Sequence, residues 1–322
     1  MPRPAADEVL LRVQYVGFCG SDLSTYLGRN PMVSYPRVPG HEVSGVIHEL
    51  GEGIQENLGI GDAVTVVPYT SCGECPSCRR GRSNACRENQ TLGVQRDGAM
   101  QEYITVPWRK ILAAPGLSKL ELAMVEPLTV GFHAIRRGSV EGSDTVMVLG
   151  CGMIGAGAIA GAVRRGSRVI AVDIDAHKLE LASLLGAKHI INSEEGDLHG
   201  ELEKLTGGDG PDVVIEAAGN PLTYRTAVEE VAFSGRVICI GYAGSEVSFA
   251  TKLFVQKEMD ILGSRNAEPE DFMEVMAFLE QGHFPLDRMI SRKLRIEEAG
   301  PAVREWASDP GKVMKILLEF TS

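Results

Sequence analysis

Residues 145–155, which read Thr-Val-Met-Val-Leu-Gly-Cys-Gly-Met-Ile-Gly, decide the fold. An apolar strand ends here in the pattern Gly150-x-Gly152-x-x-Gly155, and residues with helical spacing follow it. Glycines let the backbone turn sharply and approach a pyrophosphate, whose charge then lies at the helix N-terminus. In this context the pattern predicts the first βα turn of a Rossmann dinucleotide-binding domain. We expect cofactor contacts from Gly150, Gly152, Met153, Ile154 and Gly155.

A membrane-spanning helix is the alternative for this region, because the nineteen residues from Thr145 to Val163 carry no charge. The stretch contains five glycines, Gly150, Gly152, Gly155, Gly157 and Gly161. They cluster where a strand would turn into a helix, and therefore favour the βα interpretation. We expect no membrane segment.

Asp173 is the acid expected to bind the adenosine ribose. It ends the second predicted strand, 23 residues after Gly150, and the ribose acid of such domains follows the turn by about 20 residues. An exposed aspartate at a strand end is the alternative interpretation, and Asp175 is a second candidate for the ribose. The residue after Asp173 is Ile174 rather than an arginine that would accommodate a 2′-phosphate. The sequence therefore favours NAD over NADP.

Strands and helices alternate from about Ser143, which predicts a parallel sheet covered by helices on both faces. The predicted strands are 145–149, 168–172, 212–216 and 236–240, and the predicted helices are 154–164, 176–185 and 222–231. Short apolar runs between turn residues, such as 9–13 and 63–67, predict a mostly β domain before them. We therefore expect an α/β doubly wound domain joined to a β domain, then a helix at 270–280 and a strand within 313–318.

Composition and charge exclude several classes of partner. The chain has 322 residues, a formal net charge of −11 and a pI near 5.2, which disfavour binding to nucleic acid or an anionic membrane surface. The N-terminus has no apolar stretch followed by a small-residue cleavage site, which predicts a cytoplasmic protein. We expect a small-molecule partner and, from the general preference for closed symmetry, a homodimer or homotetramer.

Four of the seven cysteines form one loop with the spacing Cys72-x2-Cys75-x2-Cys78-x7-Cys86. Two-residue spacers can bring successive thiolates to about 2.3 Å from one metal ion, and four thiolates are typical of a closed structural zinc site. Disulfides are disfavoured in a reducing cytoplasm, and an iron–sulfur cluster is a further alternative. The spacing predicts structural zinc.

A second metal site is indicated by Cys19, His41, Glu42 and Glu126. A catalytic zinc takes about three protein ligands from cysteine, histidine and carboxylate, and leaves one position for water or substrate. These residues supply such a set. Spacing alone leaves the site open, because separated ligands have no fixed register and a lone histidine is often structural.

Together these motifs resemble the zinc-containing medium-chain dehydrogenase/reductase superfamily, which includes alcohol, sorbitol and threonine dehydrogenases. The resemblance spans nearly the whole chain. It rests on residues 19–22, residues 40–42, the four-cysteine loop, residues 126–128 and residues 150–155, in family order and at family spacing.

The resemblance implies an NAD-linked zinc oxidoreductase with two domains. A GroES-like catalytic domain is expected at residues 1–127 and 264–322, so that the terminal strand rejoins the first domain. A Rossmann domain is expected at residues 128–263. Two zinc ions per chain follow from the two separate ligand sets.

Roles at the catalytic zinc follow from the same resemblance. Cys19 and His41 are the implied ligands, and either Glu42 or Glu126 is the third, directly or through water. Asp22 matches a carboxylate that accepts a hydrogen bond from the ligand imidazole and fixes its tautomer. A turn aspartate is the alternative interpretation of Asp22.

The resemblance also implies roles in proton transfer and cofactor binding. Ser21 matches the hydroxyl that passes the released proton outward. Relatives often have a histidine three residues later, where this chain has Ser24, so the rest of its proton path differs. Lys178 is placed to assist Asp173 at the ribose.

Within the superfamily, residues 35–42, 92–98 and 264–267 look most like sugar-acid dehydrogenases that act at C5 of L-gulonate, L-galactonate or L-idonate. Arg265 lies where sorbitol-type relatives place an arginine in the substrate cleft, and a guanidinium can hold a carboxylate through two hydrogen bonds. A hinge arginine paired with an acid is the alternative interpretation of Arg265.

Three other functions remain as alternatives. The first is a sorbitol, threonine or alcohol dehydrogenase of the same superfamily. The second is a zinc-free quinone-type reductase, which should lack both metal-ligand sets. The third is a catalytically silent, NAD-responsive binding protein, because a fold does not fix a function.

Overall fold

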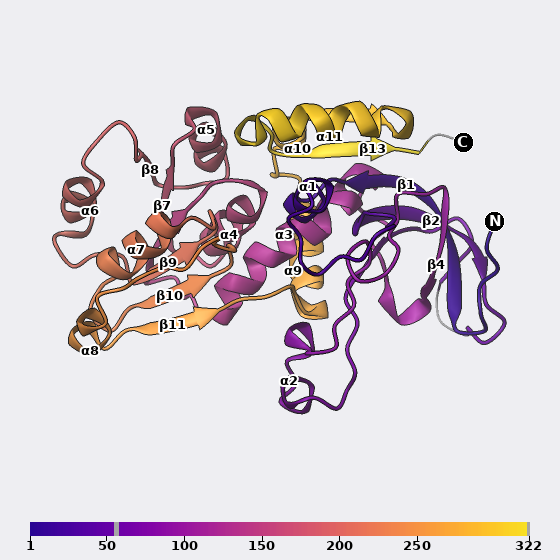
Figure 1. Ribbon diagram of the computed structural model, residues 1–322, viewed down its shortest axis with the longest axis horizontal. Helices are drawn as coiled ribbons and strands as arrows, with labels where there is room; N and C mark the ends of the chain where they lie inside the picture. Colours follow the sequence, from indigo (N-terminus) through magenta and orange to yellow (C-terminus); the bar gives the residue numbers. More distant parts are fainter. Residues whose placement is uncertain (55–57, 321–322) are drawn as a thin grey trace. The chain divides into compact units, whose positions relative to one another are not determined.

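The computed structural model describes residues 1–54 and 58–320. The chain divides into two compact units, the first formed by Met1–Pro127 with Glu268–Ser322 and the second by Leu128–Ala267. Each unit has its own sheet (Figure 1). The sequence analysis placed the return to the first unit at residue 264, whereas the structure divides the chain at Glu268.

The second unit is built on a six-stranded parallel sheet. In spatial order its strands are β11 (Asp260–Gly263), β10 (Arg236–Cys239), β9 (Val213–Glu216), β6 (Thr145–Leu149), β7 (Arg168–Asp173) and β8 (His189–Asn192). Its helices are α4 (Met153–Arg164), α5 (Ala176–Leu184), α6 (Leu198–Thr206), α7 (Pro221–Glu230) and α8 (Lys252–Lys257). The strand order reverses at β6, which pairs with both β7 and β9. Sheets of this kind bind ligands at the carboxyl ends of the strands that flank such a reversal.

The turn after β6 depends on two close-packed glycines. Gly150 has a φ of +92°, a left-handed conformation that favours glycine. A Cβ on Gly155 would overlap the carbonyl oxygen of Gly150. Gly152 is the N-cap of α4, so the helix begins directly from the turn. The glycine spacing thus lets the helix pack against the end of the strand.

The first unit is built on a mostly antiparallel sheet. Its strands follow the order β12 (Arg292–Arg295), β13 (Ile316–Glu319), β1 (Glu8–Gly17), β2 (Glu42–Leu50), β3 (Ala63–Val66) and β5 (Ile111–Ala113), and β4 (Tyr103–Pro107) also pairs with β1. Strand β13 lies antiparallel to β1 with Tyr15 opposite Glu319. The last strand of the chain therefore completes the sheet that the first strand begins.

The first unit also contains helices. They are α1 (Gly20–Tyr26), α2 (Pro76–Arg79), the first half of α3 (Lys119–Arg137), α9 (Pro269–Leu279), α10 (Leu286–Met289) and α11 (Ala299–Ser308). Short 3-10 helices lie at Ser83–Ala85, Trp108–Lys110, Ile296–Glu298 and Pro310–Lys312. Helix α11 runs along β13 (Figure 1), and its Val303 and Trp306 join the buried core of the sheet. The division between the units falls inside α3, after Pro127.

The structure confirms the predicted fold class, an α/β unit with a parallel sheet and a mostly β unit. The four predicted strands and three predicted helices of the second unit begin and end within one residue of their predicted bounds. Among the elements that the sequence analysis does not predict are α3, α6, β8 and β11. Strand β8 buries only Ile191, which leaves too weak an alternation to detect, and Pro127 lies inside α3, where proline is unusual.

The uncharged stretch from Thr145 to Val163 forms β6, the glycine turn and most of α4, as the βα interpretation predicted. Among residues 1–54 and 58–320, none of the helices combines the length and hydrophobicity needed to cross a bilayer.

The glycine turn gives a test of the packing. We predict that Gly155→Ala lowers the free energy of unfolding by about 1–3 kcal/mol, the usual cost of overpacking, because its Cβ would overlap a backbone oxygen. Gly152→Ala is the matched control, since no atom lies within 4 Å of a Cβ at that position. Urea denaturation of both variants without cofactor measures the difference. Equal losses in the two variants would contradict the packing argument.

Candidate metal and cofactor sites

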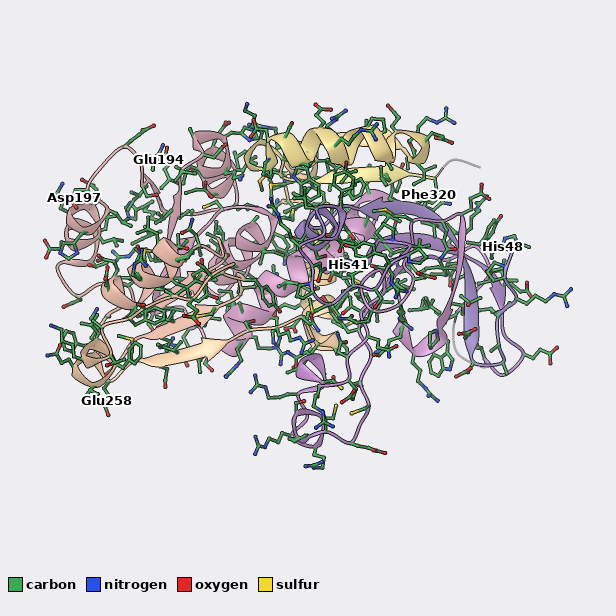
Figure 2. All side chains as sticks on the ribbon, viewed as in Figure 1. His41, His48, Glu194, Asp197, Glu258 and Phe320 are labelled. Carbon is green, nitrogen blue, oxygen red and sulfur yellow. The ribbon has the colours of Figure 1, made fainter. Side chains whose placement is uncertain are left out.

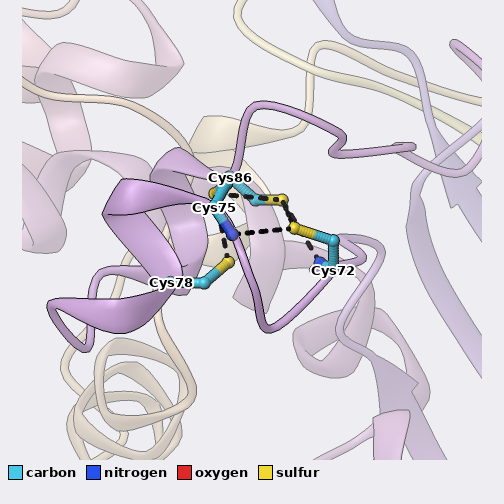
Figure 3. Close-up of side chains that lie close together, drawn as sticks. All are labelled: Cys72, Cys75, Cys78 and Cys86. Atoms are coloured by element: carbon cyan, nitrogen blue, oxygen red, sulfur yellow. Dashed lines mark hydrogen bonds between the residues drawn. The ribbon is translucent and has the colours of Figure 1, made fainter.

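The four cysteines of the loop lie together (Figure 3). Cys75 Sγ is 3.5 Å from Cys78 Sγ and 3.9 Å from Cys86 Sγ, and Cys86 Sγ is 3.6 Å from Cys72 Sγ. Four sulfurs on a tetrahedron with bonds of about 2.3 Å would lie about 3.8 Å apart. All four are free thiols rather than disulfides. The loop therefore has the dimensions of a closed tetrahedral zinc site.

Local structure prepares these sulfurs to bind a cation. The backbone N–H of Cys72 donates to Cys86 Sγ over 3.3 Å, and that of Cys75 donates to Cys72 Sγ over 3.4 Å. A hydrogen bond with the Ser77 hydroxyl is the main cause that lowers the pKa of Cys75 to about 5. The lowered pKa favours the thiolate of Cys75, the form in which a cysteine binds zinc.

A second cluster forms in the first unit at the start of β2. One ligand atom from each of Cys19, His41 and Glu42 lies within 4.8 Å of the other two. Cys19 is the N-cap of α1, and Glu42 is the first residue of β2, opposite Gly17 of β1. His41 is buried among these elements (Figure 2). The strand pairing thus brings together two segments that lie far apart in sequence.

Glu42 is held by Lys315, a residue that the sequence analysis did not identify. Lys315 Nζ donates to both Glu42 oxygens, over 2.6 and 2.7 Å, and to the Phe18 carbonyl oxygen over 3.1 Å. Both side chains are buried, with exposed fractions of 3% and 1%. Burial lowers the pKa of Lys315, but the charges of Glu42 and Cys19 outweigh it, so its pKa is raised, which favours the ammonium.

Glu126, on helix α3, lies outside this group of three but close enough to raise the pKa of His41, and it is held by a different donor. The hydroxyl of Tyr69 donates to Glu126 Oε1, and both side chains are buried. Burial and the charge of Glu126 raise the pKa of Tyr69 well above its ordinary value, so the phenol remains a donor. Burial also raises the pKa of Glu126, while His41 opposes the shift. Tyr69 was not identified from the sequence, because its position three residues before Cys72 gives no sign that it contacts Glu126.

The expected hydrogen bond between Asp22 and the His41 imidazole is absent from the described part of the chain, which corrects that expectation. Asp22 instead accepts from the backbone N–H of Cys19 over 2.9 Å, at the first turn of α1. His41 Nδ1 and Ser21 Oγ are buried without a partner among the described residues. Burial lowers the pKa of His41, but Cys19, Asp22 and Glu126 raise it well above its ordinary value.

The chemistry of this cluster fits a divalent cation. Buried carboxylates are contributed by Asp22, Glu42 and Glu126, a thiol by Cys19, and cationic groups by His41 and Lys315. Burial raises the pKa of Asp22 and of Glu126, so ionising these carboxyl groups is costly unless a cation pairs with them. A bound cation would offset that cost, and thiolate, imidazole and carboxylate are the ligands that zinc takes.

A separate cavity of about 690 Å³ lies at the strand-order reversal of the second unit. Its walls include Gly150, Gly152, Asp173, Ile174 and Lys178. Gly152 leaves open space where a Cβ would lie. The cavity thus joins the N-terminus of α4 to the end of β7, the arrangement that fits a dinucleotide.

The two candidate ribose acids have different surroundings. Asp173 Oδ2 accepts from Cys151 N over 2.6 Å, and its Oδ1 accepts from the N–H groups of Ile174 and Asp175. Asp175 is the N-cap of α5, where its side chain accepts from Lys178 N over 3.0 Å, and it does not line the cavity. Asp175 therefore serves the helix, and Asp173 faces the cavity.

The remaining predicted residues lie in both units. Met153, Ile154 and Gly155 form the first turn of α4, and Met153 and Gly155 are buried. Ser21 and Ser24 lie in α1, where Ser21 O accepts a hydrogen bond from Thr25 Oγ1. Arg265 follows β11 in the second unit and is half-buried.

Comparisons with known proteins identify the family of the chain. Residues 5–116 match the alcohol dehydrogenase GroES-like domain, and residues 154–281 match the zinc-binding dehydrogenase family. An uncharacterized zinc-type alcohol dehydrogenase-like protein of Haemophilus influenzae is 34% identical over 99% of this chain and 93% of its own. The L-galactonate-5-dehydrogenase of Escherichia coli K12 is 35% identical over 91% of this chain and 86% of its own.

A solved structure extends the comparison to the whole fold. The alcohol dehydrogenase rspB of Escherichia coli CFT073, complexed with NADH, superposes with a TM-score of 0.90 at 31% identity, covering 99% of this chain and 94% of that one. Both family matches and these relatives lead to one assignment. The chain belongs to the zinc-containing medium-chain dehydrogenase/reductase superfamily and is a zinc-type alcohol or polyol dehydrogenase.

Proposed function

We propose that the protein oxidises a secondary hydroxyl of a sugar acid with NAD, at C5 of a hexonate such as L-gulonate, L-galactonate or L-idonate. The observation that carries the proposal is the buried cluster of Cys19, His41 and Glu42, beside the buried Glu126, whose chemistry suits a catalytic zinc. The similarity to an L-galactonate-5-dehydrogenase supports the substrate class.

Each part of the site has one task in this reaction. When bound, zinc supplies a Lewis acid to the substrate hydroxyl, and NAD accepts the hydride from the carbinol carbon. Cys19 and His41 hold the metal with one of the two glutamates. Ser21, whose Oγ is buried, takes the hydroxyl proton and passes it outward. The products are the ketone, NADH and one proton, so atoms and electrons balance.

The cofactor is held by the cavity at the glycine turn. Gly150 and Gly152 admit the pyrophosphate to the N-terminus of α4, where the helix dipole favours its charge. Asp173 binds the ribose hydroxyls, and Lys178 assists it. The same carboxylate would repel a 2′-phosphate, which favours NAD over NADP.

Arg265 is proposed to bind the substrate carboxylate. A guanidinium presents two parallel N–H donors that match a carboxylate, which a neutral polyol of equal length lacks. This contact would distinguish a hexonate from sorbitol. The protein is proposed to act in the cytoplasm, where the thiols of both metal sites stay reduced.

Zinc content tests the two metal sites. We predict two zinc ions per chain in the purified protein, measured by elemental analysis. The Cys19→Ala/His41→Ala variant should retain one, because the four-cysteine loop is separate. Conversely, Cys72→Ser/Cys75→Ser should lose the structural ion. Two ions remaining in the Cys19/His41 variant would refute the catalytic site.

Cofactor preference tests the role of Asp173. We predict at least about a 10-fold preference for NAD over NADP in kcat/KM, which Asp173→Ala should narrow. Asp175→Asn is the control, because an asparagine still caps α5 and should leave the ratio unchanged. Steady-state rates with both cofactors measure it. If only the Asp175 variant changes the ratio of kcat/KM between NAD and NADP, Asp175 rather than Asp173 binds the ribose.

Substrate preference tests Arg265. The three hexonates should be oxidised faster than sorbitol, xylitol or L-threonine. Arg265→Ala should lower kcat/KM for the hexonate by about 2 kcal/mol, or about 30-fold, with a much smaller change for sorbitol. Arg225→Ala, on the exposed face of α7, is the control and should change neither. If neutral polyols or threonine are preferred, the sugar-acid proposal fails while the family assignment stands.

A further inference from the structure

Tyr69 has a buried phenol for which the proposed reaction has no role. Its side chain is 6% exposed, and that of Glu126, which accepts its hydrogen bond, is 3% exposed. The edge of the ring meets Phe272, with ring centroids 6.4 Å apart and planes at 70°. Packing therefore holds the ring while the hydroxyl donates to one carboxylate oxygen, Glu126 Oε1.

The backbone on both sides of Tyr69 is also held. Val67 N donates to Lys110 O over 2.8 Å, and Pro68 O accepts from Leu92 N over 3.0 Å. Thr70 N donates to Asn89 Oδ1 over 3.1 Å, and Thr70 Oγ1 accepts from Gln90 N over 2.7 Å. These bonds set the position of the tyrosine before any metal binds.

Asn89 and Gln90 directly follow the four-cysteine loop. Asn89 N donates to the carbonyl oxygen of Cys86, the last cysteine of the loop, over 3.3 Å. Cys72, the first cysteine, lies two residues after Thr70. The segment that carries Tyr69 is therefore anchored to both ends of that loop.

The two glutamates of the cluster are held in different ways. Glu42 has an oxygen within 4.8 Å of the ligand atoms of Cys19 and His41, but both of its oxygens accept from the Lys315 ammonium, a cation that competes with a metal for that carboxylate. Tyr69, a neutral donor, bonds Glu126 through Oε1. A carboxylate can coordinate zinc through a single oxygen, so the hydrogen bond to Oε1 is compatible with a ligand role for Glu126.

We propose that Tyr69 is a positioning residue, whose hydroxyl orients the Glu126 carboxylate so that Glu126 serves as the third protein ligand of the catalytic metal. The inference rests on the proposed catalytic metal site. Partners that orient a metal ligand commonly change metal affinity by 10- to 100-fold when they are removed. The tyrosine would also give the four-cysteine loop a role in placing a ligand of the other metal.

The test measures metal binding rather than turnover. The catalytic metal is removed from the full-length protein with a chelator while the structural zinc is retained, and Co²⁺ is titrated into the empty site by its visible absorption. Tyr69→Phe should raise the Co²⁺ Kd by about 10-fold or more and change the absorption bands. Tyr15→Phe is the matched control. It also removes a tyrosine hydroxyl that donates to a glutamate, Glu319 Oε1 at 2.7 Å, but neither residue belongs to the cluster. The control should bind Co²⁺ like the wild type.

A double-mutant cycle shows whether Tyr69 acts through Glu126. Glu126→Gln alone should weaken Co²⁺ binding, and adding Tyr69→Phe to it should cause little further loss. Full additivity, or a Tyr69→Phe variant that binds Co²⁺ like the wild type, would overturn the role of the tyrosine. A wild-type protein with no second Co²⁺ site would overturn the metal centre itself, and the inference with it. Thermal melting of each variant confirms that its fold is intact.

Discussion

Lys315 connects three segments from which the metal cluster is built. Its ammonium donates to Glu42 at the start of β2 and to the carbonyl of Phe18 after β1, while Lys315 itself precedes β13. All three donors of this buried ammonium are used. Removing one partner of a buried ion pair typically costs about 3–5 kcal/mol, because the other charge is left unpaired. The ion pair therefore holds the ends of three strands where Cys19 and His41 meet.

The cluster around that pair gathers three carboxyl groups and a thiol with one imidazole and one ammonium in a buried place. A cation bound there would favour the ionised carboxylates, and the Lys315 ammonium pairs with the carboxylate of Glu42. Tyr69 satisfies a second carboxylate without adding charge. Two glutamates with similar chemistry thus differ in the partner that holds each of them. This difference bears on which of the two can coordinate a metal.

Backbone geometry shapes the cofactor cavity of the second unit, whereas charged side chains shape the cluster of the first unit. The β6–α4 turn is close-packed, since a side chain at Gly155 would meet the Gly150 carbonyl. The resulting cavity is bordered by Asp173, whose oxygens are held by backbone N–H groups of the following residues and of the turn. The carboxylate is thereby oriented before a cofactor binds. The Asp175 side chain caps α5 and does not line this cavity.

The sequence predicted those features that depend on local spacing. The four cysteines lie within fifteen residues, and the glycine turn occupies six, so their geometry follows from short segments of backbone. Most strands and helices of the second unit could also be predicted, because a regular alternation of apolar segments marks them. Short or atypical elements could not be predicted, since β8 buries one residue and α3 contains a proline.

Partners far apart in the sequence were decided by the tertiary structure alone. Lys315 pairs with a residue 273 positions away and Tyr69 with one 57 positions away, and neither stands in a motif. Asp22 was expected to bond the imidazole, but the backbone N–H of Cys19 takes its carboxylate, because the first turn of α1 brings that donor within 2.9 Å. Local spacing can specify which residues form a loop. Which donor reaches a buried carboxylate depends on how separate strands and helices pack. Such contacts cannot be predicted from the residues on either side of the carboxylate.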